Sequence, residues 1–201
     1  MKINLDVDVH HLTRVEGHGN IRVKVEDGLI REARWDIVET PRFFEIMLKN
    51  KHYSSAGILA ARICGICSIS HCLVSIEATE RAFGITIPEG AAKLRLLAKH
   101  GETLQSHYLH LFYLVAPDCL NLPSVIPLVE SHPEIVALAG RLKGLANRLC
   151  DAVAGRTTHP VSLRVGGVTQ LPHRDALLAF RDELQRSLQD LLKANELFRS
   201  L

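Results

Sequence analysis

The stretch from Pro133 to Ala154, PEIVALAGRLKGLANRLCDAVA, gives the clearest indication of the fold. Its apolar residues recur at spacings of three and four, which places them on one side of an α-helix. Pro133 suits the first position of a helix, and Gly155 follows as a typical terminator. The pattern predicts a long helix whose apolar side is formed by Ile135, Leu138, Leu142, Leu145 and Leu149.

Similar patterns predict further helices on both sides of this one. We expect helices over 41–49 and over about 71–83, and a third that begins after Pro88-Glu89 and continues to about Val115. Another begins near Arg174 and has one apolar face, formed by Leu177, Phe180, Leu184, Leu188 and Leu191. This helix reaches Leu201 with no glycine or proline to end it, so we expect the fold to continue beyond that residue.

The first forty residues have a different pattern, typical of β structure. Ile21, Val23 and Val25 alternate with basic residues, Asp27-Gly28 forms a turn signal, and residues 29–37 supply a second strand. The predicted fold is therefore α+β and mainly α, with an N-terminal β-hairpin region over 1–40 and a long-helix bundle over 41–201. The bundle is expected to be one incomplete domain.

Composition and charge exclude several classes of protein. The chain has 201 residues, 47% of them hydrophobic, and a formal net charge of +2, which gives no basis for nucleic-acid binding. The longest apolar-leaning run, Leu109 to Ala116, is far shorter than the roughly 18 residues of a membrane span. Because acidic residues stand where a signal peptide needs an apolar segment, we expect a cytoplasmic protein.

The chain has five cysteines, and three of them lie close together in the sequence. Cys64, Cys67 and Cys72 crowd into nine positions, which suits a metal or redox site better than a disulfide scaffold. Cys119 and Cys150 are isolated among apolar residues, so we expect both to be small buried core residues.

The segment RICGICSISH, residues 62–71, is the strongest candidate for chemistry. Two thiolates separated by two residues can hold one metal or bridge two, and Arg62 and the expected helix N-terminus both favour the thiolate form. A Cys-x-x-Cys pair alone is also compatible with half of a zinc site or with a dithiol redox pair. Zinc would need a second close Cys/His pair, and a thioredoxin-like role would need a βαβ setting.

The pattern Arg-x-Cys-Gly-x-Cys-x-x-x-His resembles the N-terminal signature of nickel–iron hydrogenase large subunits, and residues 62–71 match it in full. Three more stretches resemble that family in the same order. They are TRVEGH at 13–18, QSHYLHLF at 105–112, and HP at 159–160 followed by VGGVT at 165–169. The resemblance extends over essentially the whole chain.

This resemblance implies an active site for reversible heterolytic cleavage of H₂ into protons and electrons. Cys64 would be a terminal ligand to nickel, and Cys67 would bridge nickel to an iron that also carries carbonyl and cyanide. Arg62 and His71 would orient and polarise the thiolates. Glu16 would pass protons away from a cysteine sulfur, and Glu45, in PRFFE at 41–45, would bind a separate magnesium ion.

Several of these residues have a simpler interpretation. Glu16 also suits a solvated turn, and Glu45 the exposed face of its helix. His107 and His110 lie three residues apart among leucines, which suits core histidines at least as well as a proton route. Cys72 falls outside the signature and is interpreted as a packing residue.

Two departures from the family pattern limit the resemblance. The family uses a second Cys-x-x-Cys near its C-terminus, which this chain lacks, and Ser106 stands where some branches carry an aspartate. Five cysteines are also too few for iron–sulfur clusters, so electrons would leave through clusters in a partner small subunit.

Two other functions remain as alternatives. One is a non-catalytic scaffold related to the quinone-site subunit of complex I, and the other is a small zinc or dithiol protein. Metal analysis distinguishes the three, since they predict nickel with iron, no metal, or zinc.

Overall fold

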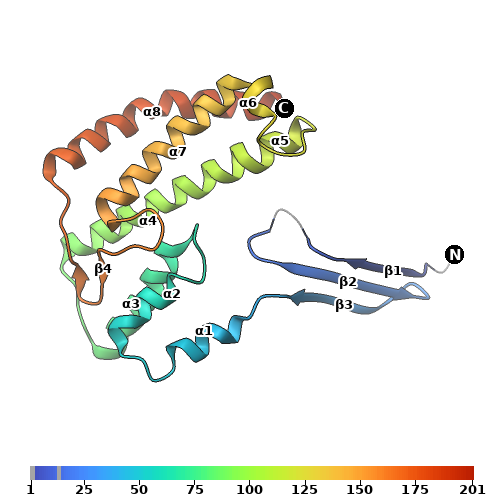
Figure 1. Ribbon diagram of the computed structural model, residues 1–201, viewed down its shortest axis with the longest axis horizontal. Coiled ribbons are helices and arrows are strands. Elements are labelled where there is room, and N and C mark those ends of the chain that lie inside the picture. Colours follow the sequence, from blue (N-terminus) through green and yellow to red (C-terminus); the bar gives the residue numbers. More distant parts are fainter. Residues whose placement is uncertain (1–2, 13–14) are drawn as a thin grey trace. The chain divides into compact units, whose positions relative to one another are not determined.

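A computed structural model describes residues 3–12 and 15–201 (Figure 1). The chain divides into two compact units, and the division falls between Ile46 and Met47. The first unit holds a small antiparallel sheet and the second is built from helices. The predicted class, α+β and mainly α with the β structure at the N-terminus, is confirmed.

The N-terminal sheet has the strand order β1 (Leu5–Val9), β2 (Gly19–Glu26), β3 (Leu29–Ile37). All pairs are antiparallel, and Val23 lies opposite Val7 on one side and Ala33 on the other. Asp27 and Gly28 connect β2 to β3 with φ angles of 56° and 79°. Positive φ at both central residues matches the twist of a two-residue hairpin turn, which explains why Asp-Gly occurs here. The predicted hairpin is confirmed, and β1 adds a third strand.

The helical unit contains the remaining elements. After α1 (Pro41–Leu48), which spans the division, come the 3₁₀ turn η1 (Tyr53–Ser55), α2 (Ala56–Ala60), α3 (Ser68–Phe83) and α4 (Glu89–Leu109). A π-helix η2 (His110–Val115), α5 (Ala116–Cys119), α6 (Leu128–Ser131) and α7 (Pro133–Ala154) follow. A two-stranded hairpin, β4 (Leu163–Arg164) and β5 (Gly167–Val168), precedes α8 (Arg174–Ser200).

The core of this unit lies along the long helices α4 and α7, with α8 packed on α7 (Figure 1). Gly101 permits the close approach of α4 and α7, because a Cβ at that position would lie 2.8 Å from the Cys150 sulfur. One buried cluster joins α3, α4, α7 and β4 and includes Ile69, Cys72, Ile76, Ala98, Leu149, Cys150 and Leu163. The other joins α4, η2, α7 and α8 and includes Tyr108, Phe112, Ile135, Leu138, Leu142, Ala146 and Ala194.

The predicted helices are present, with differences at their ends. Gly84 and Gly155 follow α3 and α7 in the left-handed conformation, as expected of helix-terminating glycines. The helix expected to begin near residue 71 begins earlier, at Ser68. The helix expected to end near Val115 continues to Cys119, but residues 110–115 adopt π geometry. Pro117 has no N–H to donate back into this stretch, which disfavours regular α-helical bonding there.

The apolar face expected on the last helix is only partly buried. Leu177, Phe180 and Leu184 pack against the first cluster and Leu191 against the second. Leu188, which we expected on the same face, is 55% exposed. α8 packs mainly along α7, so a residue at the edge of its apolar stripe remains in solvent. In the described part of the chain, no helix is both long enough and apolar enough to cross a membrane.

Candidate metal centre

The cysteine pair lies on a short loop between α2 and α3. Ala61 is the C-cap of α2, residues 62–67 form the loop, and Cys67 is the N-cap of α3. The Cys67 N–H donates to the Cys64 sulfur across 3.1 Å. A backbone donor at a helix N-terminus stabilises negative charge on an acceptor. The loop therefore places a backbone donor directly against the Cys64 sulfur.

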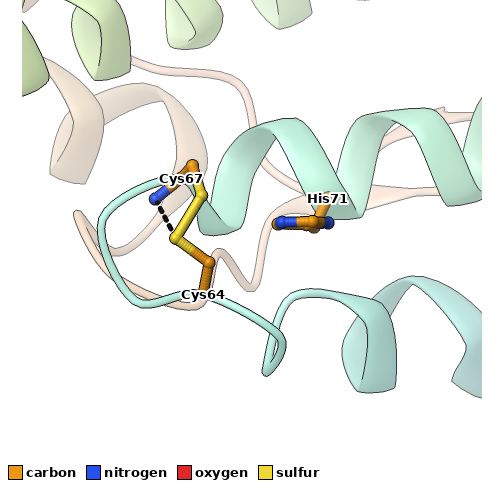
Figure 2. A group of neighbouring side chains, drawn as sticks. All are labelled: Cys64, Cys67 and His71. Atoms are coloured by element: carbon orange, nitrogen blue, oxygen red, sulfur yellow. Dashed lines mark hydrogen bonds between the residues drawn. A yellow bond between two sulfur atoms is a disulfide. The ribbon is translucent and has the colours of Figure 1, made fainter. Parts of the chain in front are cut away.

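Cys64, Cys67 and His71 converge on one point (Figure 2). Their ligand atoms all lie within 4.8 Å of one another, and all three side chains are partly buried. The two sulfurs are joined in a disulfide here, with the Cα atoms 5.5 Å apart. Because α3 begins at Ser68, His71 lies one turn beyond Cys67, and its N–H donates to the Cys67 carbonyl at 3.2 Å. Reduction of the disulfide would leave two soft sulfur donors beside an imidazole.

This donor set fits nickel and iron. Thiolate sulfur and imidazole are ligands that soft and borderline transition metals prefer over the oxygen donors that suit magnesium or calcium. In the described residues, it is also the one group of three or more Cys, His, Asp or Glu side chains with ligand atoms at such spacing. Three donors do not complete a coordination sphere, so the group forms part of a centre.

The other predicted site residues lie outside this group of three. Arg62 begins the cysteine loop, and its side chain is exposed. Glu16 and Glu45 belong to the N-terminal unit, where both side chains are exposed, Glu45 on α1. Thr13 and Arg14, the first residues of the TRVEGH stretch, lie outside the described residues.

One prediction about burial is wrong, and one of the two interpretations left open for the histidine pair does not hold. Cys119 is exposed at the end of α5, where the polar neighbours Asp118 and Asn121 already indicated solvent. His107 and His110 are exposed too and are not core histidines, because Tyr108 and Phe112 occupy the buried side of that helix.

Cys72 and Cys150 are packing residues, as predicted. Burial raises the pKa of the Cys72 thiol to about 11 and that of the Cys150 thiol to about 12. Both side chains therefore remain neutral at physiological pH and lack the thiolate that metal binding requires. Cys72 and Cys150 thus differ from the loop pair in being fully buried, whereas Cys64 and Cys67 are only partly buried.

Glu102 on α4 is a buried carboxylate that the sequence analysis did not single out. Its side chain accepts hydrogen bonds from the Ile69 N–H at 2.7 Å, from the Ser70 N–H at 3.1 Å and from the Ser70 hydroxyl. Lys99 lies 3.0 Å away and balances its charge. Glu102 thus satisfies the free N–H groups in the first turn of α3, directly after Cys67.

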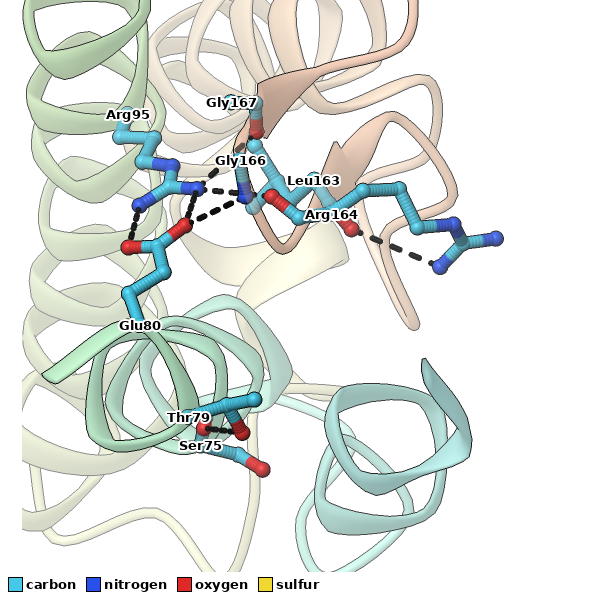
Figure 3. Close-up of polar contacts among 8 residues, drawn as sticks. All are labelled: Ser75, Thr79, Glu80, Arg95, Leu163, Arg164, Gly166 and Gly167. Atoms are coloured by element: carbon cyan, nitrogen blue, oxygen red, sulfur yellow. Dashed lines mark hydrogen bonds and ion pairs between the residues drawn. The ribbon is translucent and has the colours of Figure 1, made fainter. Parts of the chain in front are cut away.

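A second buried carboxylate, Glu80 on α3, secures the β4–β5 hairpin (Figure 3). Arg95 donates to its two oxygens at 2.8 and 2.6 Å, and the Gly166 N–H donates to one of them at 2.8 Å. Arg95 also donates to the carbonyls of Arg164 and Gly167. Hydrogen bonds from Arg95 lower the pKa of Glu80. The hairpin of residues 163–168 is therefore tied to both α3 and α4.

Comparison with known proteins gives a consistent result. The model of the family described as nickel-dependent hydrogenase matches residues 42–133, and a model described as HoxL-like matches residues 6–40. Sulfhydrogenase 2 subunit alpha from Pyrococcus furiosus is 39% identical, over 85% of this chain and 42% of the relative. Sulfhydrogenase 1 subunit alpha from the same organism is 32% identical, over 98% of this chain and 46% of the relative.

A solved structure agrees over the full length of the chain. The crystal structure of an NAD⁺-reducing [NiFe]-hydrogenase in the H₂-reduced state superimposes with a TM-score of 0.84 at 31% identity. The match covers 100% of this chain and 46% of the other. The chain thus spans less than half the length of the relatives that it matches.

Proposed function

This chain belongs to the nickel-dependent hydrogenase family, and we infer that it is part of a large subunit that catalyses reversible heterolytic cleavage of H₂. The observation that carries the proposal is the convergence of Cys64, Cys67 and His71 on the loop between α2 and α3. The scaffold alternative is not favoured, because the matching relatives are named as hydrogenase subunits and the cysteine pair is present.

Each residue of the loop has a proposed role. Cys64 would bind nickel as a terminal ligand, and Cys67 would bridge nickel and iron, the iron carrying carbonyl and cyanide. When bound, this centre supplies the chemistry that splits H₂. His71 and Arg62 would orient and polarise the thiolates, His71 from one helical turn away and Arg62 from the start of the loop.

The N-terminal unit would contribute two acidic residues. Glu16 is proposed to carry the proton away from a cysteine sulfur, and Glu45 to bind magnesium. Their support is the resemblance of the surrounding segments to the family, together with exposed side chains on which protons and ions can exchange. Neither role depends on a contact described above.

The complete enzyme would contain further protein. We propose that residues 1–40 form the β region and that 41–201 form one domain completed by large-subunit sequence not in this chain, because the relatives are more than twice as long. A partner small subunit would hold the iron–sulfur clusters that receive the electrons. We propose that the assembly lies in the cytoplasm, which cell fractionation tests.

The ligand assignment is tested by three matched substitutions in the complete enzyme. Cys64→Ser and Cys67→Ser should each abolish H₂ oxidation, because a serine oxygen cannot replace a soft, polarisable thiolate. Cys72→Ser is the control, since Cys72 lies five residues from Cys67 but points into the core. It should keep nickel and most of the activity and lose about 1 kcal/mol of stability.

Nickel and iron content measured on the same preparations completes the test. Loss of nickel in both loop variants and retention in Cys72→Ser supports the assignment. Equal loss of nickel and activity in Cys72→Ser would show that the ligand set is wrong.

A further inference from the structure

The two ends of the cysteine loop are both buried in the helical unit. Ala61, just before the loop, is 1% exposed, and Ser68, just after it, is 0% exposed. The backbone between them, residues 62–67, carries both sulfurs. The separation of the sulfurs therefore depends on how firmly these two ends are held.

One residue far along the chain contacts both ends. The His159 ring nitrogen Nδ1 lies 2.9 Å from the Ala61 carbonyl oxygen, at a sequence separation of 98. The His159 backbone N–H donates to the Ser68 hydroxyl oxygen, also at 2.9 Å, at a sequence separation of 91. Because a carbonyl oxygen only accepts, Nδ1 carries the proton in the first bond.

The backbone of His159 is shaped for this double contact. Its φ is 58°, in the left-handed region that few residues other than glycine, asparagine, aspartate and histidine adopt. Thr158, the residue before His159, lies beside the loop, because its methyl carbon is 3.8 Å from where a Cβ on Gly65 would be. The next residue, Pro160, is buried and fixes the chain on the other side.

We propose that His159 is a positioning residue that holds the two ends of the 62–67 loop together and so keeps the Cys64 and Cys67 sulfurs at ligand spacing. The proposal rests on the proposed function in taking these sulfurs as metal ligands. The two contacts of His159 with the ends of the loop do not depend on a bound metal. The proposal can therefore be tested on the metal-free chain.

The readout is the equilibrium in which the Cys64 and Cys67 thiols react with oxidised glutathione. One protein disulfide forms, and two molecules of reduced glutathione are released, so electrons and protons balance. The equilibrium constant measures how often the two sulfurs meet, and preorganisation of the loop raises it. Cys119→Ser serves as the background, because Cys119 is the one free cysteine that is exposed among the described residues.

Two nearly isosteric variants separate the hydrogen bond from the shape of the side chain. His159→Asn keeps an N–H donor where Nδ1 stands and tolerates positive φ. His159→Asp has the same shape and tolerance but turns an acceptor toward the Ala61 carbonyl. We expect the equilibrium constant to fall about tenfold in His159→Asp, equal to about 30 mV for two electrons, and to change less than about twofold in His159→Asn.

Ser68→Ala tests the contact between the His159 N–H and the Ser68 hydroxyl. It also provides the test of the proposal if His159→Asp does not fold. It removes the acceptor for the His159 N–H and should lower the constant about threefold, since the ring contact remains. Leu142→Ala is the control for general destabilisation, because Leu142 is buried in the other cluster. It should lower the stability of the chain and leave the constant unchanged.

Unchanged constants in both His159→Asp and Ser68→Ala would overturn the proposal, as would an equal fall in His159→Asn and His159→Asp. Nickel content of the Cys64→Ser and Cys67→Ser variants of the complete enzyme tests the proposed function separately. If both variants retain nickel, the ligand assignment fails, while the glutathione equilibrium of the metal-free chain still decides the role of His159.

Discussion

Glu16 is the residue at which the proton chemistry can be tested most directly. Glu16→Gln keeps the shape and hydrogen-bonding capacity of the side chain and removes the titratable group. If Glu16 carries protons, turnover of the complete enzyme should fall on the order of 10²-fold, the usual effect of losing a positioned acid or base. Conversion of para-H₂ should survive, because it needs no proton exit to solvent, and nickel and iron content should stay normal.

Three measurements on one Glu16→Gln preparation distinguish the possible roles. Turnover, solvent H/D exchange and metal content separate a proton carrier from a turn residue and from a structural residue. Glu32→Gln is the control, an acidic residue of the same unit whose side chain pairs with Arg34 at the surface. Normal exchange with full metal content in Glu16→Gln would remove Glu16 from the mechanism.

At the scale of secondary-structure elements, the β4–β5 hairpin depends on the buried pair of Glu80 and Arg95. Glu80 is 5% exposed and Arg95 3%, so removing one partner leaves the other charge buried without compensation. Glu80→Ala should therefore cost about 3 kcal/mol of stability at neutral pH in urea unfolding. Glu77→Ala, an exposed residue on the same helix, should change stability little.

The same pair predicts the direction of a pH effect. The pKa of Glu80 is lower in the folded chain than its ordinary value, chiefly because Arg95 donates hydrogen bonds to the carboxylate. Its stabilising contribution is thus complete at neutral pH, and it is lost as pH falls below about 4.3 and through the folded pKa. Between pH 7 and pH 3.5 the unsubstituted chain should lose more stability than Glu80→Ala. Equal losses would contradict the lowered pKa.

At the scale of the whole molecule, the number of ligands limits what this chain can do alone. Among residues 3–12 and 15–201, the group of metal-ligand type consists of Cys64, Cys67 and His71, and its two thiolates, which are the proposed nickel ligands, do not complete a nickel coordination sphere. The isolated 201-residue chain, reduced and supplied with nickel and iron salts, should therefore show no H₂-dependent dye reduction. H₂ uptake with stoichiometric nickel would show that the chain holds a complete site.

Local sequence was sufficient for much of the fold. The spacing of Ile135, Leu138 and Leu142 predicted a helix, and all three are buried. Asp27-Gly28 predicted the hairpin, because few other residue pairs adopt positive φ twice in succession. The convergence of the cysteine pair with His71 was also local, since those residues are at most seven positions apart. In each case the relevant interaction forms within one or two helical turns or one turn of the chain.

Tertiary structure decided what surrounds these local features. Periodicity indicates which side of a helix is apolar, but not which part of that side is covered, so Leu188 was expected in the core and is exposed. The backbone groups that Glu102 caps are 32 and 33 residues away, and the partners of His159 are 91 and 98 residues away. A side chain's role as a helix cap or loop anchor depends on which backbone atoms packing brings within 3 Å or so, and no local pattern encodes that. The sequence by itself determined the candidate metal-binding donors and most of the helices, whereas only the tertiary structure decided how the donor loop is held.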